Sequence, residues 1–296
     1  MTGLLVINKE KDMTSRDVVN SVSRILKLKK IGHTGTLDPL AVGVLVLCLG
    51  RGTKLNNLIM SEKKEYIAEV RLGIKTDTLD ITGNVISKDN KKVKKEEVLM
   101  ILKDMTTTYK QEVPIYSAVK VNGKKLYEYA RNNEEVILPK KEVTIYKLEL
   151  LSDIIDNTFT IKCEVSKGCY IRALINDIAF KLGTIGIMEN LTRTKQGKFN
   201  IENAYTLNDI KEGNYELLDI KEALGNIKEE IVDEKQEFQI LNGVKFENTH
   251  NIDKILYSNA KGELLALYKR DELDSKTLKV EVMLKIWFSP LHNIKI

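Results

Sequence analysis

The sequence predicts an α+β fold in two parts, a larger one over residues 1–225 and a small β-barrel over residues 226–296. In the first part, helical and strand-like segments are mixed rather than strictly alternating, which favours α+β over a doubly wound sheet. Residues 66–73 and 159–165 alternate apolar with polar side chains, as strands with one buried face do. From about residue 226, short strand-like runs separated by tight turns are typical of a small barrel.

The first 60 residues predict a strand, a helix, a loop and a second strand. The apolar residues 4–7 predict a short strand, and the TSRD at residues 14–17 has the pattern of a capping box that begins a helix. Residues 32–43 form a loop rich in Gly and Thr, and the apolar residues 44–49 predict a buried strand. The helix presents one apolar stripe at helical spacing, made of Val18, Val22, Ile25 and Leu26.

Further along the chain, residues 94–105 predict a second helix, and a third follows the strand at residues 159–165. Gly168 ends that strand, and Gly183 is expected to end the helix. The third helix has apolar residues at helical spacing, namely Ile171, Leu174, Ile175, Ile178, Ala179 and Leu182. In the C-terminal part, we predict strands at residues 238–241, 254–258, 264–268 and 277–284.

Composition excludes several classes of protein. With 296 residues, 43% of them hydrophobic and 30% charged, the chain can build a sizeable core and is not a disordered tail. Its longest apolar run, residues 40–49, is shorter than the ~18–20 residues that span a membrane. Charges return directly after residue 7, so no signal peptide is predicted. We therefore expect a cytoplasmic protein.

Cysteine and histidine are few and scattered. The three cysteines include no CxxC pair, as expected in a reducing compartment, and the three histidines show no HxxxH spacing. Because a zinc site needs three or four converging ligands, we expect no metal site and a metal-free mechanism.

Positive charge is concentrated near the N-terminus. Residues 1–60 hold nine Lys and Arg against four acidic residues, whereas residues 211–240 hold four lysines against nine acidic residues. This asymmetry suits a phosphate-rich partner that meets one face of the protein. Lysine-rich surfaces also keep proteins soluble, so charge alone leaves both interpretations open.

The segment GHTGTLDP at residues 32–39 combines two glycines with an aspartate before a proline. Glycine lets a backbone approach a ligand closely, and Pro39 restricts the turn that carries Asp38. The segment has no GKS or GKT, so it is not a Walker loop, and it is not a dinucleotide fingerprint. Alone, an Asp-Pro pair is more often a turn cap than a catalytic group.

Residues 32–54, GHTGTLDPLAVGVLVLCLGRGTK, closely resemble the signature of the TruB-type tRNA pseudouridine-55 synthases. Glu10, Asp12, Val113 and Asn133 depart from the usual family residues, Pro or Gly, and all four lie at expected turns. The C-terminal part resembles a PUA domain at residues 242–243 and 262–266. Other segments that resemble the family, in the same order, are residues 3–9, 14–15, 64–66, 72–80, 114–131, 166–172 and 191–193.

The resemblance implies a pseudouridine-synthase catalytic domain with a mixed, largely antiparallel sheet, followed by a PUA-like RNA-binding domain. It also implies an isomerase that converts uridine 55 in the T-loop of tRNA to pseudouridine after base flipping. The reaction involves neither redox change nor hydrolysis, so no cofactor is expected.

By this resemblance, Asp38 is the catalytic carboxylate. Whether it adds to the base, attacks the sugar or removes a sugar proton stays open. Arg172 is its expected partner, because a nearby guanidinium favours the ionised carboxylate. Tyr66 would stack on the flipped base and accept the C5 proton. The residues implied to contact RNA are Lys9, His33, Thr34, Gly35, Tyr170 and Leu191, with Leu191 packed on the uracil.

The expected partner is the T-arm of tRNA, bound by a monomer that needs no protein partner. Two other functions fit the same sequence. One is a chaperone that refolds tRNA, and the other is a guide-RNA-dependent pseudouridine synthase, which shares the Asp38 motif.

Overall fold

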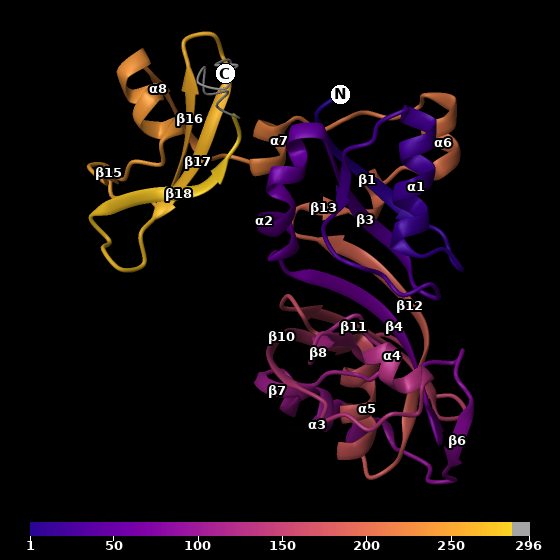
Figure 1. Ribbon diagram of the computed structural model, residues 1–296. Helices are drawn as coiled ribbons and strands as arrows, with labels where there is room; N and C mark the ends of the chain where they lie inside the picture. The colour runs from indigo at the N-terminus through magenta and orange to yellow at the C-terminus, as the bar shows by residue number, and fades with distance from the viewer. Residues whose placement is uncertain (286–296) are drawn as a thin grey trace.

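A computed structural model describes residues 1–285, and Figure 1 shows them as two bodies, each built on its own sheet. The larger sheet has nine strands, ordered β1-β3-β12-β4-β11-β10-β7, with β2 paired to β3 and β13 to β12. Its strand pairs are antiparallel except β12 with β3, so the sheet is mixed and largely antiparallel as predicted. The strands are β1 (Gly3–Lys9), β2 (Ile31–His33), β3 (Val42–Leu49), β4 (Lys64–Leu72), β7 (Thr108–Glu112), β10 (Lys140–Leu150), β11 (Thr158–Val165), β12 (Gly186–Gln196) and β13 (Phe199–Asn200).

The main hydrophobic core lies between one face of this sheet and four helices. The predicted alternation in β4 is confirmed, with Tyr66, Ala68, Val70 and Leu72 buried on the core side. The capping box that begins α1 is also confirmed, because Thr14 and Asp17 exchange hydrogen bonds. The four helices are α1 (Ser15–Leu26), α3 (Lys95–Asp104), α5 (Ile171–Lys181) and α6 (Leu207–Glu212).

A second apolar cluster covers the opposite face of the sheet at β1 and β3. Leu5 and Ile7 face the main core, whereas Leu4 and Val6 face this second cluster. Strands buried on both faces are apolar at every position, which explains the unbroken apolar run in β3. The second cluster includes residues of η1 (Gly50–Leu55), α2 (Asn56–Met60) and α7 (Ile220–Leu224), and η2 (Ile201–Asn203) packs against it.

Two hairpins and one short helix extend from the larger body. The β5–β6 hairpin leads into the segment before α3, and the β8–β9 hairpin leads into α4. Their bounds are β5 (Ile74–Thr76), β6 (Val85–Lys88), β8 (Lys120–Val121), β9 (Lys124–Lys125) and α4 (Leu126–Arg131).

The C-terminal body is a curled five-stranded sheet, ordered β14-β16-β17-β18-β15 (Figure 1). Leu256 and Leu284 pack into the second apolar cluster and join this body to β1 and β3. The proposed domain boundary falls between α7 and β14 and stays a prediction; residues 286–296 of the proposed second domain lie outside the described residues. The elements are β14 (Lys228–Val232), α8 (Glu234–Leu241), β15 (Phe246–Glu247), β16 (Lys254–Asn259), β17 (Leu264–Arg270) and β18 (Thr277–Met283).

One predicted strand is wrong. Residues 238–241 form the second half of helix α8, which begins at the capping box of Asp233 and Gln236. Short apolar runs do not distinguish strand from helix by themselves, and the capping signal lies before the run. Ile240 is buried, whereas Phe238 is 57% exposed, a one-sided burial typical of a surface helix. No helix among residues 1–285 is long and apolar enough to cross a membrane.

Candidate active site

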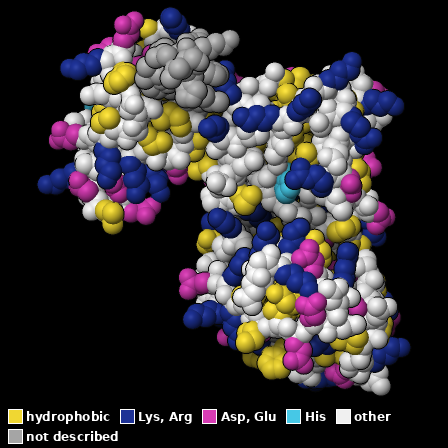
Figure 2. All heavy atoms as spheres, in the orientation of Figure 1, with side chains coloured by type: hydrophobic (Ala, Val, Ile, Leu, Met, Phe, Trp, Pro, Cys, Tyr) yellow, Lys and Arg dark blue, Asp and Glu magenta, His cyan; other side chains and the backbone are white. Residues whose placement is uncertain are grey.

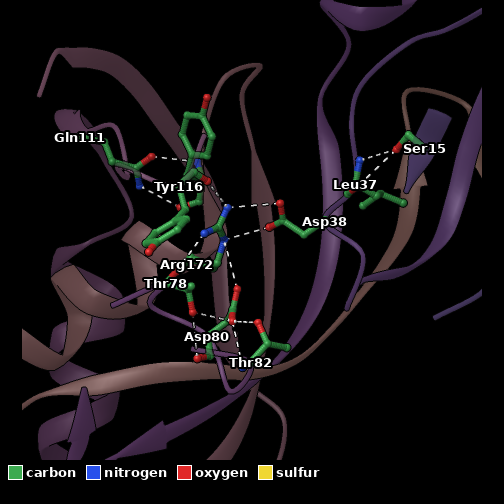
Figure 3. Close-up of polar contacts among 10 residues, drawn as sticks. Ser15, Leu37, Asp38, Thr78, Asp80, Thr82, Gln111, Tyr116 and Arg172 are labelled. Carbon is green, nitrogen blue, oxygen red and sulfur yellow. Dashed lines mark hydrogen bonds and ion pairs between the residues drawn. The ribbon is translucent and has the colours of Figure 1, made fainter. Parts of the chain in front are cut away.

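Asp38 and Arg172 form a bidentate ion pair at the centre of the candidate site (Figure 3). Arg172 Nε donates to Asp38 Oδ2 at 2.9 Å, and Nη2 donates to Oδ1 at 3.2 Å. Asp38 lies in the loop before β3, and Arg172 lies in the first turn of α5. The Arg172 side chain is 5% exposed and that of Asp38 is 37% exposed. Arg172 therefore holds the carboxylate in place on its buried side, and the other side of the carboxylate is open to solvent.

The loop that carries Asp38 is attached to the body on both sides. Before Asp38, the Leu37 amide donates to the Ser15 hydroxyl at 2.9 Å. After it, the Pro39 carbonyl accepts a hydrogen bond from the Lys9 ammonium at 3.2 Å. Leu37 is itself buried in the main core. These contacts restrict the movement of the loop and so keep the Asp38 carboxylate beside Arg172.

The guanidinium of Arg172 has partners on its other sides as well. Nη1 donates to the Thr78 carbonyl at 2.9 Å, and Nη2 donates to the Tyr116 carbonyl at 3.1 Å. A second carboxylate, Asp80, lies 3.8 Å from Nε and is 8% exposed. Asp80 is held in place by the backbone amide and the hydroxyl of Thr82. Arg172 is thus oriented by two loops as well as by Asp38.

Tyr66 and Leu191 lie on neighbouring strands, β4 and β12, and both are 6% exposed. Burial raises the pKa of the Tyr66 phenol, and the adjacent Arg193 guanidinium opposes that rise. Arg193 pairs with Tyr66 across the two strands and is 1% exposed. Near neutral pH, the Tyr66 hydroxyl is therefore protonated.

Arg193 also fixes the Gly35 segment. Its Nε donates to the Val44 carbonyl at 2.6 Å, and its Nη2 donates to the Gly35 carbonyl at 3.2 Å. Gly43 has φ +100°, and a Cβ there would overlap the Arg193 backbone. Only glycine allows β3 and β12 to approach this closely.

The other predicted RNA-contacting residues differ in their exposure. Lys9 and Thr34 are both 0% exposed. The Lys9 ammonium donates to three backbone carbonyls, those of Glu10, Met13 and Pro39. The Thr34 hydroxyl accepts a hydrogen bond from Gln196. In this structure, the polar groups of both side chains form hydrogen bonds with other groups of the protein.

His33 and Tyr170 are partly exposed. Burial, followed by the charges of Arg16 and Arg193, lowers the pKa of His33, so its imidazole is neutral at physiological pH. Burial raises the pKa of the Tyr170 phenol, and Arg172 and Asp38 both lie close enough to influence it. His33 and Tyr170 remain available for a ligand, and contact with RNA stays a prediction for all six residues.

Three residues of the site have polar side chains that motif reasoning did not assign. Asp80 lies within the segment at residues 72–80, Arg193 ends the segment at residues 191–193, and Gln111 lies on β7. The residues around Arg193 in β12, LTRTKQ, do not alternate apolar with polar side chains, so no local pattern indicates that Arg193 is buried. The contacts of Asp80 and Gln111 join segments distant in sequence, and no local pattern predicts them.

Two family models match this chain over adjoining ranges. The model described as TruB family pseudouridylate synthase (N terminal domain) matches residues 23–171, and the tRNA pseudouridylate synthase B C-terminal domain matches residues 172–228. The chain belongs to the TruB family of pseudouridylate synthases. The Asp38–Arg172 ion pair connects the two matched ranges, because Asp38 lies in the N-terminal range and Arg172 in the C-terminal range.

Relatives in the TruB family are similar over most of their length. The tRNA pseudouridine synthase B of Caldanaerobacter subterraneus subsp. tengcongensis is 43% identical over 255 residues, which cover 86% of this chain and 89% of the relative. The protein of the same name from Staphylococcus saprophyticus is 41% identical over 298 residues, covering 93% and 98%. That of Clostridium tetani is 39% identical, covering 92% and 93%.

Solved structures share the fold of this TruB-family chain. A Cbf5-Nop10-Gar1 complex matches with a TM-score of 0.68 and 23% identity, covering 96% of this chain and 85% of the other. An H/ACA RNP bound to a substrate RNA containing 2'-deoxyuridine matches with a TM-score of 0.67 and 23% identity, covering 97% and 85%. This coverage includes the C-terminal sheet, a half-barrel consistent with a PUA-like domain.

Proposed function

We propose that this chain isomerises uridine to pseudouridine in tRNA, at position 55 of the T-loop, as a cytoplasmic monomer that needs neither cofactor nor protein partner. Family membership supports the reaction, and relatives named tRNA pseudouridine synthase B support tRNA as the substrate. Position 55 follows from the sequence resemblance. The observation that carries the proposal is the Asp38–Arg172 pair, with its carboxylate held rigidly and partly exposed.

The isomerisation breaks the bond between N1 of uracil and C1′ of ribose and forms a bond between C5 and C1′. A proton leaves C5 and a proton is gained at N1, so no electrons and no atoms are exchanged with a cofactor. The ionised Asp38 can serve as a nucleophile or as a base toward the nucleotide. Two parallel hydrogen bonds from Arg172 hold its carboxylate in a fixed orientation.

Tyr66 is proposed to form the platform for the flipped base. Because burial raises the pKa of its phenol, the hydroxyl can accept the C5 proton only if it passes its own proton onward. Arg193, the neighbour that opposes this rise, would stabilise charge developing on the phenol oxygen. Stacking and proton transfer are therefore separable roles for Tyr66.

The RNA would reach the site along a basic surface. Figure 2 shows Lys and Arg side chains gathered around the narrowed middle of the larger body. Extruding a base costs a few kcal/mol, and stacking on an aromatic ring returns about 1–3 kcal/mol. Phosphate contacts would then supply the net affinity. His33 and Tyr170, which are partly exposed, are the proposed contacts beside the flipped nucleotide.

A tRNA-folding chaperone and a guide-RNA-dependent synthase are the alternatives. The structure that belongs to an H/ACA RNP is 23% identical to this chain, whereas a relative named for tRNA reaches 43%. That difference favours a synthase acting directly on tRNA. Activity on a tRNA transcript by the protein alone would exclude the guide-dependent alternative.

Single-turnover tritium release from tRNA labelled at C5 of uridine tests the proposal. Asp38→Asn should abolish release. Arg172→Lys should reduce release about a hundredfold, because lysine keeps the positive charge but cannot form the bidentate hydrogen bonds. Asp156→Asn is the matched control, since Asp156 is exposed and lies at φ +49°, where asparagine is well tolerated. Release by Asp38→Asn at the wild-type rate would refute the proposed role of Asp38. An Asp38→Asn protein that lacked release but still fully served the cell would favour the chaperone.

A further inference from the structure

Gln111 is a buried polar residue on β7, outside the side chains that surround the Asp38 carboxylate. It is 2% exposed, and its amide faces the beginning of α5 (Figure 3). Gln111 Oε1 accepts a hydrogen bond from the Tyr170 amide at 2.8 Å, and Nε2 donates to the Tyr170 carbonyl at 3.2 Å. The side chain thus forms hydrogen bonds with both the backbone N–H and the backbone C=O of Tyr170, as a residue on an adjacent antiparallel strand would.

Tyr170 is the residue that Gln111 holds, and it is the N-cap of α5. No side chain of its own caps the helix there. The first turn of a helix leaves backbone amides without partners inside the helix. Gln111 satisfies the Tyr170 amide from another strand, two residues before Arg172. The start of α5 is therefore fixed from β7.

The chain after Gln111 supports Arg172 a second time. It leads from β7 to Tyr116, whose carbonyl accepts a hydrogen bond from Arg172 Nη2 at 3.1 Å. Gln111 therefore joins the loop that contacts the guanidinium to the helix that carries it. A shift of either segment would change the distance between Arg172 and Asp38.

A separate contact braces the same strand against the middle of α5. The Tyr109 hydroxyl donates to Asp177 Oδ2 at 2.8 Å and accepts a hydrogen bond from Gln111 Nε2 at 3.0 Å. Asp177 is partly exposed, so water can replace that hydroxyl if it is removed. We call the Tyr109–Asp177 hydrogen bond the brace, and the two hydrogen bonds between Gln111 and the Tyr170 backbone the clamp. The two can be tested separately.

We propose that Gln111 is a positioning residue for the reaction: by clamping the Tyr170 backbone, it sets the orientation of Arg172 toward Asp38. The proposal rests on the proposed function of the site. It predicts that loss of the clamp slows the chemical step more than it weakens tRNA binding. A misplacement of a reacting group by about 1 Å can cost about a hundredfold in rate.

The first test compares Gln111→Ala with Tyr109→Phe, using single-turnover tritium release at saturating tRNA and filter binding of the same tRNA. Gln111→Ala should lose about ten- to a hundredfold in rate with a dissociation constant within about threefold of wild type. Tyr109→Phe removes the contact with Asp177 and one hydrogen bond of Gln111, but it leaves both hydrogen bonds between Gln111 and the Tyr170 backbone, and it should stay within about threefold in both. Equal losses in the two variants would show that the brace matters and would overturn the proposal.

The second test uses pH. In Gln111→Glu, an ionised carboxylate can accept from the Tyr170 amide but cannot donate to its carbonyl; a protonated carboxyl can do both. The rate of this variant relative to wild type should therefore rise as the pH falls from 8.5 to about 6. A purely steric role would not produce this recovery. A relative rate that falls toward acid would overturn the proposal.

Hydrogen exchange separates this inference from the proposed function. In the free protein, Gln111→Ala should increase amide exchange at Tyr170 and the first turn of α5, while α1 remains as protected as in wild type. Unchanged protection of α5 would overturn the clamp whatever the activity. If the wild-type protein released no tritium from tRNA while the exchange result held, only the proposed function would fail.

Discussion

The Ser15 hydroxyl accepts a hydrogen bond from the Leu37 amide at 2.9 Å, which attaches the residue before Asp38 to the first turn of α1 (Figure 3). Ser15 is 2% exposed and also lies 3.3 Å from the Leu37 carbonyl. Ser15 therefore belongs to the helix and also supports the loop that carries the Asp38 carboxylate.

Ser15→Ala should destabilise the protein, because it leaves the buried Leu37 amide without its partner. The cost of such an unsatisfied group is about 1–3 kcal/mol in the free energy of unfolding. Urea unfolding measures it. Ser21→Ala on the same helix is the control, since Ser21 is partly exposed and its hydroxyl accepts a hydrogen bond from the Arg24 side chain, and it should change stability by less than about 0.5 kcal/mol. Equal effects of the two substitutions would contradict the role of Ser15.

Tyr66→Phe and Tyr66→Leu separate stacking from proton transfer. The phenylalanine keeps the ring and should bind tRNA nearly normally, but it should lose about 10²–10⁴ in rate if the hydroxyl transfers the C5 proton. The leucine removes the ring as well and should bind the flipped state about five- to a hundredfold less well. Single-turnover tritium release and filter binding on one tRNA measure both. Near wild-type turnover by Tyr66→Phe would leave Tyr66 as a platform only.

Lys9 should make stability depend on pH above neutrality. Burial lowers the pKa of its ammonium to about 8, well below its ordinary value in an unfolded chain. Between pH 8 and about 10.5, the unfolded chain therefore binds a proton that the folded protein has lost, and the free energy of unfolding rises with pH. Lys9→Met should reduce this rise in urea unfolding between pH 7.5 and 9.5.

The control for Lys9 is Lys11→Met, because Lys11 is exposed two residues away. It should keep the wild-type pH dependence. Part of the rise should survive in Lys9→Met, since burial also lowers the pKa of Lys64 to about 8. An unchanged pH dependence in Lys9→Met would show that the Lys9 ammonium keeps its proton throughout this range.

The C-terminal body should stabilise the larger one through Leu256. This side chain is 3% exposed and packs in the cluster that covers β1 and β3. Leu256→Ala should cost about 2–5 kcal/mol in the free energy of unfolding. Leu273→Ala, at a side chain that is 92% exposed, should be nearly neutral. Deleting the chain from residue 226 would uncover the same surface, so point substitutions test the contact more cleanly. A neutral Leu256→Ala would mean that the two bodies fold independently.

Local signals in the sequence predicted several elements of the fold. The capping box at residues 14–17 predicts the start of α1, because a helix begins with hydrogen bonds between residues three apart. The alternation in β4 and β11 predicts which face is buried, since successive side chains of a strand point to opposite sides. Each of these signals depends on residues only a few positions apart.

Two of the longest strands, β10 and β12, were not predicted from the sequence. Each spans 11 residues. In β10, a bulge between Ile145 and Lys147 interrupts the alternation of the buried residues, and in β12 the buried positions include Arg193 and Gln196. Arg193 occupies a core position in β12 because backbone carbonyls from β3 and the Gly35 loop satisfy its guanidinium. Such a position is identified only when the strands are in register.

The sequence by itself determined the fold class, the family and the motif containing Asp38. The tertiary structure alone decided that Lys9 is buried, that residues 238–241 are helical, and that Gln111 clamps the start of α5. Asp38 and Arg172 are 134 positions apart, and their two hydrogen bonds form only because the sheet contains β3 and packs against α5, which brings the loop before β3 to the start of α5. Local sequence encodes capping and alternation, whereas the satisfaction of a buried polar group depends on whichever distant segment supplies its partner.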